Sequence, residues 1–172
     1  MTNSPRFIHL RTHTEYSLLE GALRLKKLPD QCKSAEMPAI AMTDTNNMFA
    51  ALEFSVTLSD AGIQPIVGCQ VDFTYQQAAP GEKPREPAPL VFLAQSEQGY
   101  ENLMKLNSCL YVDKGHQLPQ VTIEELEQYS AGVICLSGGP NGPIGMLLQQ
   151  GQRPAAEELM TRLKSIYPDR LY

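Results

Sequence analysis

The chain has 172 residues, a hydrophobic content of 42% and a formal net charge of −5. This length suits one domain with a substantial core, and the acidic balance argues against a large sequence-independent nucleic-acid surface, which needs basic side chains. No apolar run approaches the roughly 18 residues of a membrane span, and residues 1–6 lack the apolar segment of a secretory signal, so we expect a cytoplasmic protein with no membrane partner.

Short apolar runs alternate with helical patterns along the chain. The apolar runs predict strands at Phe7–Leu10, Pro38–Asp44, Ile63–Phe73 (bent at Gly68), Leu90–Gln95 and Gly132–Gly139. The helical patterns predict helices at Leu28–Met37, Asn47–Gly62, Ser96–Val112, Val121–Ser130, Pro143–Gly151 and Pro154–Pro168. Such alternation is typical of an α/β protein with parallel strands, and the strands are too few to close a barrel.

Several local signals support these boundaries. Thr122 and Glu125 form a capping-box pattern, and Ser96 is a good N-cap residue. Residues Gln76–Leu90 contain four prolines and are predicted to form an exposed loop. Asp169–Tyr172 resembles the beginning of a further strand. In the helix Asn47–Gly62 the predicted core-facing residues are Met48, Ala51, Leu52, Val56 and Ser59.

The four cysteines are widely scattered and form no C-x-x-C pair. This spacing disfavours a zinc ribbon or a redox dithiol. We interpret all four, Cys32, Cys69, Cys109 and Cys135, as reduced structural residues.

Polar clusters follow the first two predicted strands, at Leu10–Ser17 and Thr43–Asn47, and a third cluster, Gly68–Val71, lies within the third strand. In parallel α/β folds functional groups gather at the carboxyl ends of strands, and His with Asp would suit a metal centre for phosphoester hydrolysis. These clusters contain few good metal ligands, however, because Arg11 lies between His9 and His13 and the third cluster offers only an amide, Gln70. The residues alone therefore disfavour a tight metal site.

Three residues or motifs admit a functional and a structural interpretation. Asp44 could be a general base, although an ion pair or helix cap is favoured. Tyr16 could stack on a base, although a packed loop aromatic is favoured. The glycine-rich Ser137–Pro143 could cradle a phosphate, although a simple chain reversal is favoured.

Three ordered blocks carry a family resemblance: HLRTHTEYSLLEGA (9–22), PAIAMTDTNNMFAALEF (38–54) and AGIQPIVGCQV (61–71). They resemble the polymerase and histidinol phosphatase (PHP) family, and within it the N-terminal domain of bacterial DNA polymerase III α subunits. The resemblance implies that residues 1–172 are the N-terminal portion of one PHP domain, the first part of a distorted (β/α)7 barrel with parallel strands, and a fragment of a longer polymerase chain.

The resemblance also implies a degenerate metal site. In the family's H-x-H motif the second histidine matches His13, and Arg11 replaces the first. In its Asp-His motif Asp44 matches and Thr45 replaces the histidine, while Gln70 stands where a glutamate is usual. His13 and Asp44 are then remnant ligands. We expect no catalytic residue in this segment, and a structural ion pair between Arg11 and Asp44.

The function implied is that of a DNA-directed DNA polymerase in DNA replication, a nucleotidyltransferase whose Mg-dependent polymerase domain lies elsewhere. This segment would be an inactive scaffold that needs no cofactor, although family members with a full ligand set bind Zn or Mn. Its partners would be the rest of the polymerase chain, the proofreading exonuclease subunit, other replicase subunits and, through the parent protein, DNA. The alternative is an active metal-dependent 3′–5′ exonuclease or phosphoesterase; a free-standing histidinol-phosphate phosphatase is less favoured.

Overall fold

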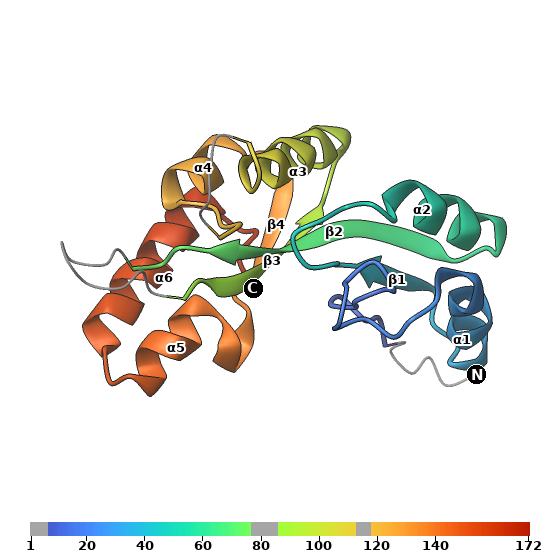
Figure 1. Ribbon diagram of the computed structural model, residues 1–172, viewed down its shortest axis with the longest axis horizontal. Helices are drawn as coiled ribbons and strands as arrows, with labels where there is room; N and C mark the ends of the chain where they lie inside the picture. The colour runs from blue at the N-terminus through green and yellow to red at the C-terminus, as the bar shows by residue number, and fades with distance from the viewer. Residues whose placement is uncertain (1–6, 77–85, 113–117) are drawn as a thin grey trace.

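The computed structural model describes residues 7–76, 86–112 and 118–172. The sheet has the order β1-β2-β3-β4 and consists of β1 (Ala39–Met42), β2 (Gln64–Phe73), β3 (Ala88–Ala94) and β4 (Val133–Leu136). The helices are η1 (Leu25–Lys27), α1 (Leu28–Ser34), α2 (Ala51–Asp60), α3 (Glu97–Cys109), α4 (Ile123–Gln128), η2 (Gly139–Asn141), α5 (Pro143–Gln149) and α6 (Arg153–Ile166) (Figure 1). The α/β class is confirmed.

The strand β2 changes partner at Gly68. Its first part pairs in parallel with β1, ending at Met42 opposite Val67. Its second part pairs antiparallel with β3, beginning at Gly68 opposite Leu93. A Cβ added at Gly68 would lie 2.3 Å from the Phe92 carbonyl oxygen, so the close approach of β3 requires glycine here.

The expectation that all strands are parallel is wrong, because β2–β3 and β3–β4 are both antiparallel. A parallel neighbour needs a long crossover, usually through a helix, and no helix lies between β2 and β3 in the described part of their connection. The sequence did contain a signal for the direction of β3, because it predicted a Pro-rich loop and no helix between these two strands.

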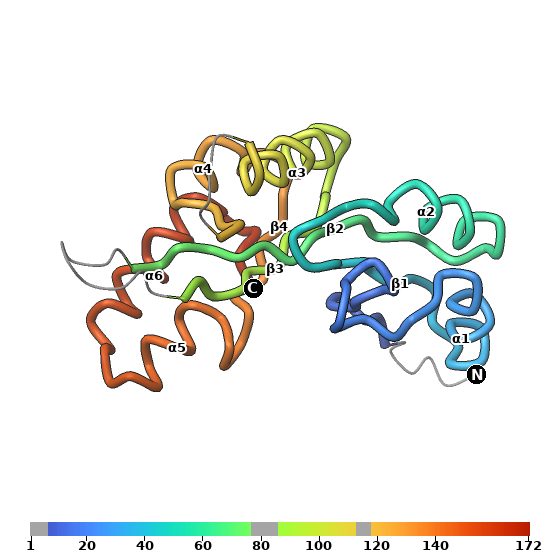
Figure 2. Tube along the Cα trace, viewed as in Figure 1, coloured from blue at the N-terminus to red at the C-terminus, as the bar shows by residue number. Residues whose placement is uncertain are grey.

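In the described residues the buried apolar side chains form two large clusters and a small third one, which consists of Ala41, Val91 and Leu93. The two large clusters lie on the two halves of β2, and the helices around each half can be followed in Figure 2. The first joins α1, β1 and α2 through residues such as Cys32, Ile40 and Phe54. The second packs one face of β2, β3 and β4 against α3, α4 and α6, and includes Cys69, Val71 and Phe73. Because side chains alternate along a strand, Gln70 and Asp72 lie on the opposite face of the sheet.

The helix signals are confirmed. Ser96 accepts a hydrogen bond from the Gly99 amide at the start of α3, and Thr122 and Glu125 form a complete capping box at α4. The buried face of α2, however, differs from the prediction. It consists of Ala51, Phe54 and Leu58, whereas Leu52 and Val56 are exposed.

Three further segments test the sequence-based boundaries. Phe7–Leu10 is not a strand, although the His9 carbonyl accepts from the Ala41 amide of β1. The predicted loop ends earlier than Leu90, since β3 begins at Ala88, and its residues 77–85 lie outside the described residues. Leu171 forms a parallel bridge with Cys135, as expected for the beginning of another strand.

The cysteines agree with a structural role, since none of the four forms a disulfide within the described residues. Burial raises the pKa of Cys69 to about 12 and also raises the pKa of Cys135. In residues 7–76, 86–112 and 118–172, no helix combines the length and the apolar character that crossing a bilayer requires.

Candidate functional site

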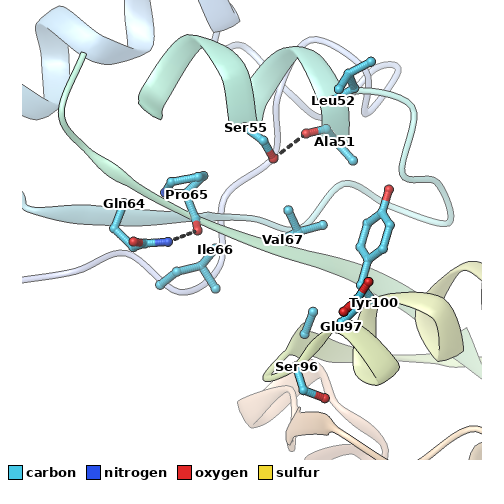
Figure 3. Close-up of a pocket in the computed structure, with 11 residues that line it drawn as sticks. Ala51, Leu52, Ser55, Gln64, Pro65, Ile66, Val67, Ser96, Glu97 and Tyr100 are labelled. Carbon is cyan, nitrogen blue, oxygen red and sulfur yellow. Dashed lines mark hydrogen bonds between the residues drawn. The ribbon is translucent and has the colours of Figure 1, made fainter. Parts of the chain in front are cut away.

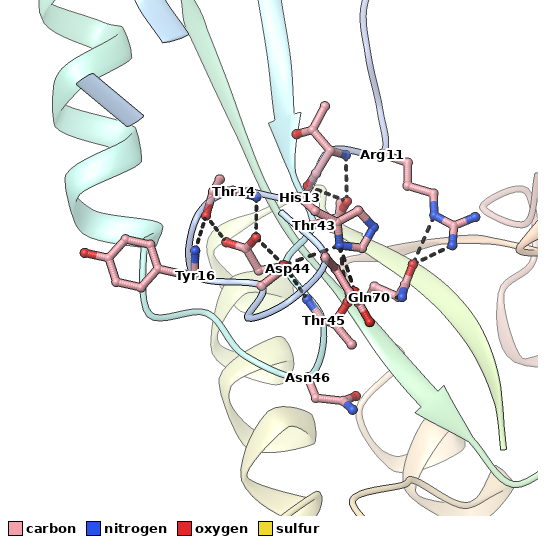
Figure 4. A network of polar contacts seen from close by, with 12 residues as sticks. Arg11, His13, Thr14, Tyr16, Thr43, Asp44, Thr45, Asn46 and Gln70 are labelled. Carbon is pink, nitrogen blue, oxygen red and sulfur yellow. Dashed lines mark hydrogen bonds and ion pairs between the residues drawn. The ribbon is translucent and has the colours of Figure 1, made fainter. Parts of the chain in front are cut away.

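The predicted polar clusters meet at the carboxyl end of β1 (Figure 4). The N-terminal segment lies against this end because Thr43 donates its amide to the Thr12 carbonyl and Thr12 donates its amide to the Thr43 hydroxyl, both at 2.9 Å. A parallel bridge between Thr45 and Gln70 brings the next strand alongside. Arg11, His13, Asp44, Thr45 and Gln70 therefore belong to one site, as the sequence predicted.

The buried carboxylate of Asp44 accepts three hydrogen bonds from neutral donors. Its Oδ1 accepts from the Thr14 amide and the Ser17 hydroxyl, both at 2.6 Å, and its Oδ2 accepts from the Thr14 hydroxyl at 2.7 Å. Buried carboxylates need such bonds to offset the loss of hydration. Asp44 therefore anchors the 14–17 turn, and its oxygens face that turn.

Arg11 contacts Gln70. Its Nε and Nη2 donate to Oε1 of Gln70 at 3.0 and 2.7 Å, and Nε2 of Gln70 donates to the Thr45 hydroxyl at 3.2 Å. The predicted ion pair between Arg11 and Asp44 is wrong, because Arg11 contacts Gln70 instead. Asp44 points toward Thr14, while Arg11 and Gln70 lie on the other side of His13 (Figure 4).

His13 lies at the centre of the network. Its Nδ1 is 3.2 Å from the Thr45 hydroxyl, 3.3 Å from the Ser17 hydroxyl and 3.6 Å from Oε2 of Glu20. The Thr45 hydroxyl also donates to Glu20 at 2.5 Å. One nitrogen of His13 is therefore surrounded by two hydroxyls and a carboxylate.

Sequence reasoning missed Glu20. It lies beyond two exposed leucines, which concealed it from a search for polar clusters. The chain turns back here because Gly21 donates its amide to the Ser17 carbonyl at 2.8 Å, and a Cβ on Gly21 would lie 1.7 Å from the Thr14 carbonyl oxygen. The signal available in the sequence was this glycine directly after an acidic residue.

A second missed pair consists of Asn46 and Asp72. Asn46 donates its side-chain amide to Oδ2 of Asp72 at 2.8 Å, and its Oδ1 accepts from the Asp72 backbone amide at 3.0 Å. Burial raises the pKa of Asp72, the Asn46 hydrogen bond opposes this, and the charge of Glu20 raises it further. Asp72 therefore lies within electrostatic range of Glu20.

The donors do not fit a resident metal ion. Across the described ranges, no group of three or more His, Cys, Asp or Glu residues is arranged to hold one. The oxygens of Asp44 face the 14–17 turn, and Oε1 of Gln70 accepts from Arg11. A guanidinium is a permanent cation, so Arg11 would repel a metal placed beside it.

A family model described as the PHP domain matches residues 9–172, which is nearly the whole chain. The chain belongs to the PHP family. Among curated proteins, this PHP segment is 37% identical over 168 residues to the DNA polymerase III subunit alpha of Caulobacter vibrioides and 38% identical over 167 residues to that of Treponema pallidum. These matches cover 96% and 94% of the chain, but the chain spans only 15% and 14% of the length of those relatives.

Solved structures agree on the fold of the PHP segment. A Bifidobacterium adolescentis protein assigned as a metal-dependent phosphoesterase superposes with a TM-score of 0.54 at 9% identity, covering 94% of this chain and 85% of that chain. An amidohydrolase from Chromobacterium violaceum, solved with sulfate and no metal, gives a TM-score of 0.50 at 14% identity, with 87% and 73% covered. At these identities the likeness shows the fold alone, a partial distorted barrel.

Proposed function

We propose that the chain is the N-terminal PHP segment of a cytoplasmic replicative DNA polymerase III α subunit. The relatives from Caulobacter and Treponema support this, since each matches nearly the whole chain at more than a third identity. The parent protein would extend DNA from deoxynucleoside triphosphates with Mg in its polymerase domain. The geometry of its polar site indicates the role of this segment within the parent protein.

That role is an inactive scaffold. The observation that carries this proposal is the contact of Arg11 with Gln70, which places a fixed cation and a neutral amide at two positions where PHP relatives use metal ligands. Asp44, a matching ligand position, directs its oxygens to the 14–17 turn. The network holds the N-terminal segment against β1 and β2, which suits a structural role.

The scaffold would hold the rest of the polymerase chain and dock the proofreading exonuclease subunit, alongside other replicase subunits. An acidic chain, with a net charge of −5, is better matched to a protein partner than to phosphates. DNA would then be bound by other parts of the parent protein.

The test is the metal content of the full-length gene product, purified without chelator and dialysed against trace zinc and manganese. We expect less than about a tenth of an equivalent of either metal, and a gain of tight binding in the triple variant Arg11→His, Thr45→His, Gln70→Glu, because it restores two imidazoles and a carboxylate. A full equivalent in the natural protein, together with cleavage of DNA 3′ ends, would instead establish the active phosphoesterase.

A further inference from the structure

The buried apolar side chains of the described residues divide at Gly68 of β2. Every buried member of the cluster around α1, β1 and α2 precedes this glycine, and every buried member of the cluster around α3, α4 and α6 follows it. The small third cluster crosses the division at the glycine itself, because its member Leu93 lies opposite Gly68. The described residues before Gly68 therefore form a first half, and those after it form a second half, each with a core of its own (Figure 1).

Few apolar contacts join the two halves away from Gly68. Within the described ranges, Met48 and Tyr100 are the side chains that pack against the large cluster of the other half, and both are only partly buried. An open groove lined by residues such as Ser55, Val67 and Tyr100 separates α2 from the start of α3 (Figure 3). Close packing therefore does not hold α2 against α3.

Asn46, in the first half, is bound to the second half through four hydrogen bonds. Its backbone amide donates to the Gln70 carbonyl at 2.7 Å, and its carbonyl accepts from the Tyr111 hydroxyl at 2.8 Å. Its side chain donates to the Asp72 carboxylate at 2.8 Å and accepts from the Asp72 backbone amide at 3.0 Å. The φ of Asn46 is +56°, a conformation that asparagine tolerates better than most residues do. One residue thus joins the first half both to β2 and to the segment that follows α3.

The hydrogen bonds of Asn46 reach farther from Gly68 than the other polar contacts described between the halves. Apart from the strand ladder, those contacts end on Cys69 or Gln70, directly beside the glycine, as the contact of Arg11 with Gln70 does. Asp72 lies beyond them along β2. A bond at a greater distance from a pivot opposes rotation more effectively, so Asn46 is the polar residue best placed to fix the angle between the halves.

We propose that Asn46 fixes the relative orientation of the two halves, and that the halves rotate about Gly68 when its hydrogen bonds are broken. Rotation of packed units about a few backbone residues is a common conformational change in proteins. Because Arg11 and Thr45 belong to the first half and Gln70 to the second, such a rotation would also alter the polar site. This inference concerns movement within the PHP segment and goes beyond the proposed scaffold role.

The experiment measures the distance between spin labels on α2 and α3 of the full-length gene product by double electron–electron resonance. The labels are attached to p-acetylphenylalanine introduced at Asp60 and Lys105, which are both exposed, so the natural cysteines stay in place. We expect Asn46→Gly to widen the distance distribution at least about twofold, because glycine tolerates the φ of +56° but lacks the two side-chain hydrogen bonds. The matched control is Glu36→Gly, at a residue of the first half with a φ of +53°, and it should leave the distribution unchanged.

A milder variant, Tyr111→Phe, provides the second measurement. It removes one hydrogen bond and keeps the Asn46 side chain, so it should widen the distribution by less than Asn46→Gly does. Hydrogen exchange of the α2 and α3 amides should stay slow in both variants, since each half keeps its own core. Distributions as narrow as that of the natural protein in both variants would show that β2 alone fixes the angle, and the inference would be overturned. A joint loss of exchange protection in α2 and α3 would overturn it as well, because the halves would then unfold as one cooperative unit.

Discussion

Arg11 and Gln70 are joined by a forked contact in which Nε and Nη2 of the arginine donate to one amide oxygen, at 3.0 and 2.7 Å. The contact links the N-terminal segment to β2 across 59 positions of sequence. Because Gln70 is neutral, the contact leaves the positive charge of Arg11 in place. A fixed cation beside His13 is therefore a structural property of this site.

The first prediction concerns Arg11. Its side chain is exposed and its partner is an amide, so Arg11→Ala should lower the free energy of local opening by only about 1 kcal/mol, the range of an ordinary hydrogen bond. Hydrogen exchange of residues 11–17 in the full-length gene product measures this. A loss of several kcal/mol would mean that Arg11 balances a buried charge after all.

We expect Asp44 to contribute more to local stability than Arg11 does. It is fully buried and accepts three hydrogen bonds, and in Asp44→Asn an NH₂ group would face donors. We expect local opening of residues 12–17 to become easier by about 3 kcal/mol, measured by the same exchange experiment. Asp60→Asn, at the exposed end of α2, is the matched control and should change nothing; equal effects of the two substitutions would contradict the anchoring role.

A pH dependence follows from Asp72. Its pKa is raised in the folded protein, chiefly by burial, so the folded state binds its proton more tightly than the unfolded state. The stability contributed by this group is present below its ordinary pKa of 3.8 and is lost as the pH rises through the raised value. Asp72→Asn should therefore be more stable than the natural protein at about pH 7, and this advantage should shrink toward about pH 4.

The measurement is hydrogen exchange of residues 69–73, corrected for the intrinsic rate at each pH. The substitution keeps an oxygen that can accept from Asn46, so the geometry is preserved. An advantage of Asp72→Asn that grows as the pH falls would have the opposite sign and would refute the assignment.

Gly68 should be the least tolerant position in β2. In Gly68→Ala the new methyl group would lie 2.3 Å from the Phe92 carbonyl oxygen, at the residue where β2 passes from β1 to β3. We expect a loss of at least about 3 kcal/mol, seen as a sharp fall in soluble yield and in the unfolding temperature.

The control for this prediction is Gly151→Ala. Gly151 has a φ of +71° and open space around it, so its substitution should cost only about 1 kcal/mol of backbone strain. A Gly68→Ala protein as stable as this control would show that β3 can move away from β2 without penalty.

The sequence by itself determined most of the helices and strands and five residues of the site, although it missed Glu20 and predicted a strand at Phe7–Leu10 that does not form. Local chemistry was sufficient for this: Ser96 and Thr122 cap the helices they precede, and the apolar run that forms β1 is followed at once by the polar residues of the site. His13, Asp44 and Thr45 were predicted near one another because they follow the first two predicted strands, and Gln70 was placed with them from the third strand, in which it lies.

The tertiary structure decided how the strands pair and which polar side chains contact each other. The pairing of β3 depends on β2 and β4, and which side of α2 is buried depends on β1 and α1, since a pattern with apolar residues on both sides of a helix does not choose between them. Arg11 contacts Gln70, whereas the carboxylate of Asp44 accepts hydrogen bonds from the 14–17 turn. Glu20 lies beside His13 because Gly21 turns the chain back. These features depend on contacts between residues that are distant in sequence, or on a single backbone turn. The periodicity and composition of the sequence do not specify such contacts or turns.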